Sequence, residues 1–326
     1  MKTKIITIDE AVLFLKNNDN FLILCHVNPD GDTLGSGYAL CGALHLMGKH
    51  AKVICDDEPS PRFDYLLGAI NSDLTDFKTE DAVIITVDVA DPELLGSLKD
   101  KYKAELCIDH HISNKKYAEQ TLLDTEASSC AEVVWGLVKA LDVKITPQIA
   151  EAVYTGISTD TGCFRYSNTT ANAHAIAAQL IGLGVDTAKI NYLMFEMKTR
   201  QRIKLEQQAF SAMEYYFNDR CAVVALTADM LEGVDPEDAG NVSILPKQIE
   251  GVEVGVIMKE KPSESDSCPS QTIWKVSVRT NTEINAQSIC NSLGGGGHIR
   301  AAGCTLKGTL DSVKQTVLRE IESQII

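Results

Sequence analysis

Short apolar runs alternate with helical patterns through the first half of the chain. The runs have the length of β-strands and lie at residues 21–25 (FLILC), 51–55 (AKVIC), 82–87 (AVIITV) and 104–108 (AELCI). Apolar residues recur at helical spacing at residues 34–47, 129–141, 147–157 and 171–183. Strands that alternate with helices in this way predict an α/β fold, in which a parallel sheet carries helices on both faces.

The pattern changes near residue 187. Residues 187–217 are charged and poor in glycine, which predicts a helical linker. After it, we expect a strand at 221–227, a hairpin of residues 251–260 and 272–280 around the polar loop 261–271, and a final helix at 310–325. These elements predict a smaller α+β domain with a mixed sheet. A chain of 326 residues is long enough for two domains, which we place at residues 1–186 and 218–326.

The net charge limits the ligands that this chain can bind. The sequence holds 30 basic and 45 acidic residues, a balance of −15, which opposes the counterion-releasing attraction that holds long nucleic acids. Small phosphate-bearing ligands stay possible, because bound cations and a few arginines can make the electrostatic potential positive at a single site. No apolar run approaches the roughly 20 residues of a membrane span, and the 10 cysteines show no CxxC pair. We therefore expect a cytoplasmic protein with reduced, buried cysteines.

Side chains of the types that bind metal ions follow directly after three of the predicted strands. They are His26, Asp30 and Asp32 after the first strand, Asp88 after the third, and Asp109, His110 and His111 after the fourth. A further aspartate, Asp160, is expected just after a helix. The carboxyl ends of parallel strands share one edge of the sheet, where α/β proteins place their sites. Any one of these clusters could be an ordinary polar turn, but together they indicate one site.

The residue types favour a centre of two divalent metal ions. Four aspartates balance the charge of two such ions, and neutral imidazoles add nitrogen donors that first-row transition metals accept. This mixed shell suits Mn²⁺ better than Mg²⁺, which prefers oxygen ligands. An aspartate shared by both ions, for which Asp88 is the natural candidate, would hold them about 3.5–4 Å apart. Such a pair activates water and neutralises the charge that develops on a phosphoryl group.

The motifs resemble those of the DHH phosphoesterase superfamily. HVNPDGD (26–32), VDVAD (87–91), DHH (109–111) and TGISTDTG (155–162) look like its four motifs in order. The segment GGGGHIRAAG (294–303) resembles the signature of the DHH-associated domain that follows in one branch. The resemblance implies that residues 1–186 form the metal-binding catalytic domain and residues 218–326 a substrate-binding domain.

The resemblance also assigns roles position by position. It implies one metal ion on His26, Asp30 and Asp88, and a second ion on Asp32, Asp88, His110 and Asp160. Beside Asp88, the residues implied to take part in catalysis are His111, as a proton donor next to the substrate phosphate, and Asp109, which orients a histidine.

A second set of residues is expected to contact the substrate. Gly295, Gly296 and Gly297 with His298 and Arg300 could be a plain structural turn, or an anion-binding turn at the start of a helix. The resemblance favours the second interpretation, with the far end of the substrate against His298 and Arg300 and a third contact from Arg279. Arg165 and Tyr166 could contact a phosphate and a base, or could pack locally.

In its two-domain length and its DHH-associated domain, the chain resembles the nanoRNase/pAp phosphatase branch of the superfamily. That branch implies hydrolysis of short oligoribonucleotides (nanoRNA) and of 3′-phosphoadenosine 5′-phosphate (pAp), by a possible homodimer without long nucleic-acid or membrane partners. The enzymatic alternative is a phosphodiesterase for cyclic di-AMP or pApA. A processive exonuclease of the RecJ type lacks support because of the acidic charge, and the glycine-rich tail argues against a family II pyrophosphatase. The non-enzymatic alternative is a metal-dependent nucleotide sensor, although a complete ligand set favours an enzyme.

Overall fold

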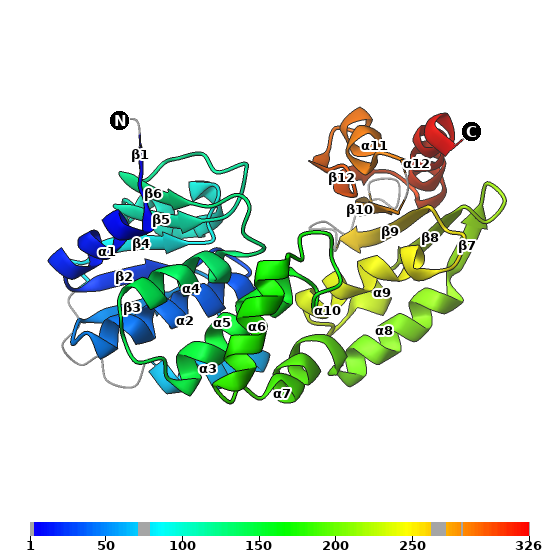
Figure 1. Ribbon diagram of the computed structural model, residues 1–326. Helices are drawn as coiled ribbons and strands as arrows, with labels where there is room; N and C mark the ends of the chain where they lie inside the picture. The colour runs from blue at the N-terminus through cyan, green and yellow to red at the C-terminus, as the bar shows by residue number, and fades with distance from the viewer. Residues whose placement is uncertain (1–2, 71–78, 262–271, 282, 326) are drawn as a thin grey trace. The chain divides into compact units, whose positions relative to one another are not determined.

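The chain folds into two units, Met1–Met197 and Lys198–Ile326. The computed structural model describes residues 3–70, 79–261, 272–281 and 283–325. Figure 1 colours the first unit from blue to green and the second from green to red. The predicted polar loop lies outside the described residues, except for Lys261. No helix in the described ranges is long and apolar enough to cross a bilayer.

The first unit is built on a parallel six-stranded sheet with the order β1-β6-β5-β4-β2-β3. Its strands are β1 (Lys4–Ile5), β2 (Phe21–Leu24), β3 (Ala51–Ile54), β4 (Val83–Val87), β5 (Leu106–Asp109) and β6 (Gln120–Leu123). All four predicted strands are confirmed within two residues at each end. The strands β1 and β6 were not predicted, because β1 has only two residues and β6 begins with the polar Gln120 and Thr121, so neither forms a continuous apolar run.

Both faces of this sheet are buried, which explains why the strand runs are continuously apolar. On one face, Ile23 and Ile85 pack into a core with the helices that follow the strands. On the other face, Leu22 and Ile84 pack against Leu95, which belongs to the 3-10 segment Pro92–Asp100. The predicted α/β class is therefore confirmed for this unit (Figure 1).

Except for α3, each helix of the first unit begins at a residue whose side chain caps its first turn. They are α1 (Ile8–Asn17), α2 (Gly31–Leu46), α3 (Asp64–Ile70), α4 (Cys130–Ala140), α5 (Pro147–Asp160), α6 (Ala171–Gly182) and α7 (Thr187–Asn191). The α2 helix begins three residues earlier than predicted, because the Asp30 side chain accepts from the backbone N–H groups of Asp32 and Thr33. The expectation that Asp160 follows a helix is wrong, since α5 continues to that residue.

The helices α2 and α5 approach each other backbone to backbone. A Cβ atom on Gly35 of α2 would lie 2.4 Å from the carbonyl oxygen of Ala152 and 2.9 Å from the amide nitrogen of Gly156, both on α5. Only glycine fits this contact. The close approach brings Asp32, on α2, near the end of α5 that carries Asp160.

The predicted helical linker, residues 187–217, contains helices but is not helical throughout. The short α7 leads into a π-helical turn, Tyr192–Glu196, and Met197 then leaves the helical region at φ −64° and ψ 126°. The next helix, α8 (Arg200–Ser211), starts afresh with Thr199 as its cap. The last residues form β7 (Met213–Tyr216), which pairs with the following strand, so the boundary between the two units falls inside this stretch.

The second unit contains a mixed six-stranded sheet with the order β11-β12-β10-β9-β8-β7. Its other strands are β8 (Cys221–Leu226), β9 (Val254–Lys261), β10 (Ile273–Thr280), β11 (Gly296–His298) and β12 (Ala301–Lys307). Its other helices are α9 (Ala228–Leu231), α10 (Pro236–Asn241), α11 (Ala286–Ser292) and α12 (Leu310–Ile325). The predicted hairpin and final helix are confirmed.

Each face of the second sheet has its own core. Val256 and Val278 face α11 and α12, whereas Ile257 packs with Leu205 of α8 and with Leu245 in the 3-10 segment Val242–Gln248. The glycine run was expected at the start of a helix, and this is wrong: α11 ends before the run, which continues into β11.

Candidate metal centre and active site

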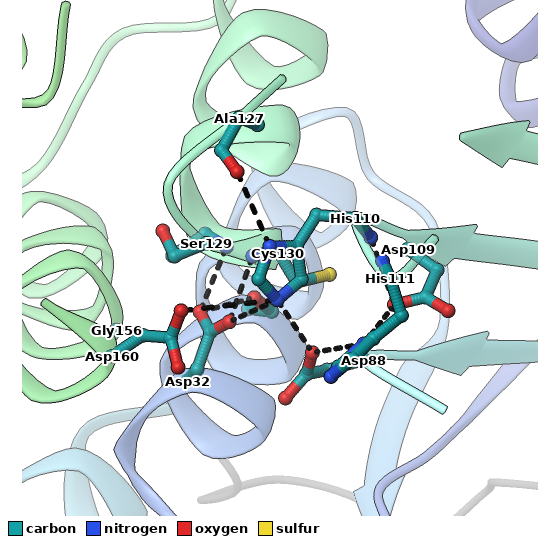
Figure 2. Close-up of polar contacts among 12 residues, drawn as sticks. Asp32, Asp88, Asp109, His110, His111, Ala127, Ser129, Cys130, Gly156 and Asp160 are labelled. Carbon is teal, nitrogen blue, oxygen red and sulfur yellow. Dashed lines mark hydrogen bonds and ion pairs between the residues drawn. The ribbon is translucent and has the colours of Figure 1, made fainter. Parts of the chain in front are cut away.

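Three neighbouring strands of the first sheet deliver the predicted ligands to one place. The strands β5, β4 and β2 are adjacent, with Leu24 beside Thr86 and Val87 beside Ile108. The residues that follow them therefore meet at the carboxyl edge of the sheet. In Figure 2 the carboxylates of Asp32, Asp88 and Asp160 are directed toward the ring of His110.

One group of possible metal ligands contains His26, Asp30 and Asp88. The Nε2 atom of His26 lies 3.6 Å from Oδ1 of Asp30 and 3.7 Å from Oδ2 of Asp88. The other ring nitrogen, Nδ1, lies 2.8 Å from the carbonyl oxygen of Val27. Because a carbonyl only accepts, Nδ1 carries the proton in the neutral ring, and the lone pair of Nε2 points to the two carboxylates.

A second group contains Asp32, His110 and Asp160. The Nε2 atom of His110 lies 3.9 Å from Oδ2 of Asp32 and 3.8 Å from Oδ2 of Asp160. Its Nδ1 faces the carbonyl oxygen of Ala127 at 3.3 Å. The two histidines thus have the same arrangement, with a backbone carbonyl behind the ring and carboxylates in front of it.

Asp88 lies between the two groups. Its Oδ2 faces His26, and its Oδ1 lies 3.6 Å from Nε2 of His110 and 3.5 Å from Nδ1 of His111. Oδ1 is buried and has no hydrogen-bond partner among the described residues. The residue also has a φ of +59°, which is uncommon for a residue with a side chain and costs free energy. A buried carboxylate oxygen that lies near two imidazoles but makes no hydrogen bond with the described residues fits a shared metal ligand.

Asp32 is held by the start of a helix. Its Oδ2 accepts from the N–H of Cys130 at 2.7 Å and its Oδ1 from the N–H of Ala131 at 2.9 Å, in the first turn of α4 (Figure 2). These two bonds and the helix dipole stabilise the ionised carboxylate. A Cβ atom on Gly156 would lie 2.8 Å from Oδ1 of Asp32, so the glycine leaves room for it.

Asp109 orients His111. The Asp109 side chain is fully buried, and its Oδ1 lies 2.7 Å from Nδ1 of His111 while its Oδ2 accepts from Nδ2 of Asn114 at 2.6 Å. The hydrogen bonds from His111 and Asn114 outweigh burial and lower the pKa of Asp109, so it is ionised and accepts from Nδ1–H. The contact leaves Nε2 of the half-exposed His111 as the other reactive nitrogen of the ring.

The carboxylates of the centre lack a counter-charge. Burial and the charges of Asp88 and Asp160 raise the pKa of Asp32, and burial raises the pKa of Asp88 and brings that of Asp160 to about 6. Burial acts to lower the pKa of His26, but the hydrogen bonds that the ring donates to Asp30 and Asp88 outweigh it and raise that pKa to about 10. Divalent cations would relieve this repulsion and displace the imidazole proton. The donor set therefore fits a divalent metal centre.

The chain matches two family models. Residues 20–157 match the DHH family, N-terminal domain, and residues 219–326 match the DHHA1 domain. The bifunctional oligoribonuclease and PAP phosphatase NrnA of Thermus thermophilus is 32% identical over 93% of this chain and 89% of that protein. This chain belongs to the DHH family. The family that the four motifs and the glycine-rich tail predicted is confirmed.

Two further similar proteins each match 98% of this DHH protein. A Mycoplasma pneumoniae protein, also named bifunctional oligoribonuclease and PAP phosphatase NrnA, is 27% identical over 98% of this chain and 97% of that protein. Among solved structures, an exopolyphosphatase-related protein from Bacteroides fragilis matches with a TM-score of 0.83, over 98% of this chain and 96% of that chain. Its sequence is 23% identical, so this match shows the shared fold.

Two asparagines that the motif analysis missed support the centre of this DHH protein. Asn114 binds Asp109, as described above. Asn168 donates from Nδ2 to Oδ2 of Asp160 at 3.1 Å and to the carbonyl oxygen of Ser128 at 2.9 Å. Both follow a motif within eight residues, but a polar residue in such a position is equally typical of a turn. Only the folded chain shows their partners.

Arg165 and Tyr166 make local contacts. The Nε atom of Arg165 donates to the carbonyl oxygen of Gly162 at 2.6 Å, and its guanidinium lies 5.8 Å from the centre of the Phe195 ring. The Tyr166 ring packs over Gly162, where a Cβ atom would come within 2.4 Å of it. Tyr166 nevertheless remains half-exposed. A contact of either residue with a substrate stays a prediction.

The DHHA1 domain places the predicted substrate residues on or beside three adjacent strands, with Arg300 in the turn between β11 and β12 and Gly295 just before β11. Arg279 of β10 lies beside Ala301 of β12, which in turn lies beside His298 of β11. A Cβ atom on Gly295 would lie 2.2 Å from the carbonyl oxygen of Gly303, and Gly297 has a φ of +143°, so both are needed for the pairing itself. His298 and Arg300 are exposed. Their contact with a substrate also stays a prediction.

Proposed function

We propose that this DHH protein is a two-metal phosphoesterase that hydrolyses nanoRNA to mononucleotides and pAp to AMP. The observation that carries the proposal is the Oδ1 atom of Asp88, which lies between two groups of possible metal ligands and is buried without a hydrogen bond among the described residues. The substrates are those for which the similar proteins from Thermus thermophilus and Mycoplasma pneumoniae are named. The charge of −15 supports short substrates over long nucleic acids.

The metal ligands in this proposal are His26, Asp30 and Asp88 for one ion, and Asp32, Asp88, His110 and Asp160 for the other. The mixed nitrogen and oxygen donors favour Mn²⁺. When bound, the ions supply an activated water and positive charge next to the phosphoryl group. The protein would supply the fixed geometry, since Asp30 caps α2 and Asp32 is held by α4.

His111 is proposed to donate a proton to the leaving oxygen. The hydrogen bond to Asp109 raises the pKa of His111 to about 9, so the ring is protonated at neutral pH. Its Nδ1–H stays on Asp109, and Nε2–H is the proton available to the substrate. Each turnover adds water across one P–O bond: the hydroxyl goes to phosphorus and the proton to the nucleoside oxygen.

The DHHA1 domain is proposed to bind the far end of the substrate through Arg279, Gly295, Gly296, Gly297, His298 and Arg300. Arg165 would contact a phosphate from the first unit. All cysteines among the described residues are free thiols, which fits a reducing cytoplasm.

A substrate panel tests the proposal. Purified protein with Mn²⁺, Mg²⁺ or Co²⁺ is offered pAp, pApA, cyclic di-AMP and a labelled trinucleotide, and products are separated by chromatography. AMP from pAp and mononucleotides from the trinucleotide are expected, with the highest rate in Mn²⁺. Turnover confined to cyclic di-AMP or pApA would instead make this chain a cyclic-dinucleotide enzyme. Tight nucleotide binding without any product would indicate a sensor.

A further inference from the structure

One face of the second sheet carries a row of basic side chains. Along β10, Lys275, Ser277 and Arg279 alternate with Val276 and Val278, which are buried in the core on the opposite face. Lys259 of β9 is the direct neighbour of Lys275. Lys247, at the end of the adjacent 3-10 segment, lies near enough to Arg279 for its charge to affect the lysine. We call Lys247, Lys259, Lys275 and Arg279 the basic stripe.

The basic stripe has no acidic counterpart among the described residues. None of its four side chains forms an ion pair there, although the chain has 45 acidic residues. Burial and the charges of Lys275 and Arg279 lower the pKa of Lys259 to about 8. Burial and Arg279 likewise lower the pKa of Lys247. Cations that are partly buried next to one another are unfavourable without an anion, so the stripe is arranged to receive one.

Toward β12, the surface between these side chains carries only small residues. Ser277 lies beside Gly303 on β12, and Arg279 lies between Gly255 of β9 and Ala301 of β12. On the β9 side the same face is covered, because α8 packs over Ile257 and the 3-10 segment packs over Gly255, where a Cβ atom would lie 2.8 Å from the amide nitrogen of Lys247. Gly303 and Ala301 therefore leave the β12 side of the stripe as the approach for a ligand.

The length of the stripe determines which ligands can contact all of it. Lys275 and Arg279 are four residues apart on one strand, which corresponds to about 13 Å. A single phosphate group is too small to contact both ends at once. The stripe therefore matches a chain with several anionic groups. Arg279 and His298 are both direct cross-strand neighbours of Ala301, so the stripe continues to the glycine-rich turn.

We propose that the basic stripe binds the internal phosphodiester groups of an oligonucleotide, in addition to a terminal contact at the glycine-rich turn. This inference rests on the proposed function, because it assumes that oligonucleotides are substrates. It adds Lys247, Lys259 and Lys275 to the substrate contacts. Binding should strengthen with each phosphodiester group that reaches the stripe, and pAp, which has no internal phosphodiester, should depend on it little.

Equilibrium binding to the full chain tests the stripe separately from catalysis. A fluorescent pentaribonucleotide is titrated with Lys259→Gln, Lys275→Gln and wild-type protein in EDTA, which prevents turnover, at several salt concentrations. Each substitution should raise Kd about three- to tenfold and should reduce the slope of log Kd against log salt by about 0.7. Displacement of the probe by pAp should stay within about twofold of wild type in the same variants.

Two further variants control the experiment. Lys204→Gln removes one charge from an exposed lysine of α8 and should bind like the wild type. Lys275→Arg keeps the charge and should keep the affinity. Lys275 is itself exposed, so its variants are expected to fold, which thermal unfolding checks.

The outcomes for the stripe and for the enzyme can be told apart. Unchanged Kd and salt slope in both glutamine variants would overturn the stripe, while hydrolysis by the wild type would still support the proposed function. Absence of turnover on every substrate, together with weaker binding in the glutamine variants, would overturn the function and leave the stripe as a binding surface.

Discussion

The Oδ1 atom of Asp88 lies 3.6 Å from Nε2 of His110, while its Oδ2 lies 3.7 Å from Nε2 of His26. One carboxylate therefore connects two histidines that are 84 residues apart. Since Oδ1 is buried without a hydrogen bond among the described residues, the geometry is maintained at a cost that metal binding would offset.

Asp88→Asn should abolish binding of both metal ions and lower kcat by at least about a hundredfold, because an amide cannot supply two anionic oxygens. Metal content of the dialysed protein, measured by atomic emission, checks this. Asp142→Asn is the matched control, since Asp142 is exposed and has a φ of +58° that asparagine tolerates. An Asp88→Asn protein that retains two ions would contradict the shared role.

Metal affinity should rise with pH. The pKa of His26 is about 10 in the metal-free protein, so binding at Nε2 must release a proton over the whole neutral range. Asp160, with a pKa of about 6, adds a further proton release below that pH. Calorimetric titrations with Mn²⁺ between about pH 6 and 8, in buffers of different ionisation enthalpy, should show this release. A pH-independent affinity would contradict the assigned ligands.

Removal of the metal should lower the melting temperature. Without cations, the buried carboxylates repel one another, whereas bound cations stabilise only the folded centre. Thermal unfolding in EDTA and with increasing Mn²⁺ checks this, and the melting temperature should rise steadily with metal concentration. In Asp88→Asn, the same titration should have little effect.

Asn168→Ala should weaken metal binding about 10- to 100-fold, because it removes the hydrogen bond that orients Asp160. Competition with a fluorescent chelator measures this loss independently of activity. Asn17→Ala, at an exposed position at the end of α1, should behave like the wild type. If excess Mn²⁺ fails to restore activity to Asn168→Ala, the residue does more than position a ligand.

Asp109→Asn should reduce kcat by about 10- to 100-fold and leave KM nearly unchanged. An asparagine does not hold His111 in the same protonated state, since it lacks the charge that raises the pKa of His111 to about 9. The acidic control Asp142→Asn should leave kcat as it is. A rise in KM at constant kcat would instead place His111 in substrate binding alone.

The sequence by itself determined most of the secondary structure and the ligand types. Continuous apolar runs such as residues 21–24 are buried on both faces, so their strands are visible without tertiary information. Ligands placed directly after such strands, such as Asp88, must lie at the carboxyl edge of a parallel sheet. Patterns that depend on partners were less informative: β6 and β7 form by pairing with neighbours, and the segment predicted as a helical linker ends in the strand β7.

Only the tertiary structure decided which groups touch. Asp32 and the start of α4 are almost a hundred residues apart, and Gly156 of α5 leaves room for their hydrogen bonds, since a Cβ atom there would lie 2.8 Å from Oδ1 of Asp32 and 2.4 Å from Cβ of Ala131. The unpaired Oδ1 of Asp88, the support of Asp160 by Asn168 and the basic stripe on β9 and β10 likewise depend on strand register and helix packing. The local pattern of apolar and polar residues indicates which segments are buried and where strands end. The distances between side chains that are remote in the sequence are set only when the whole chain packs.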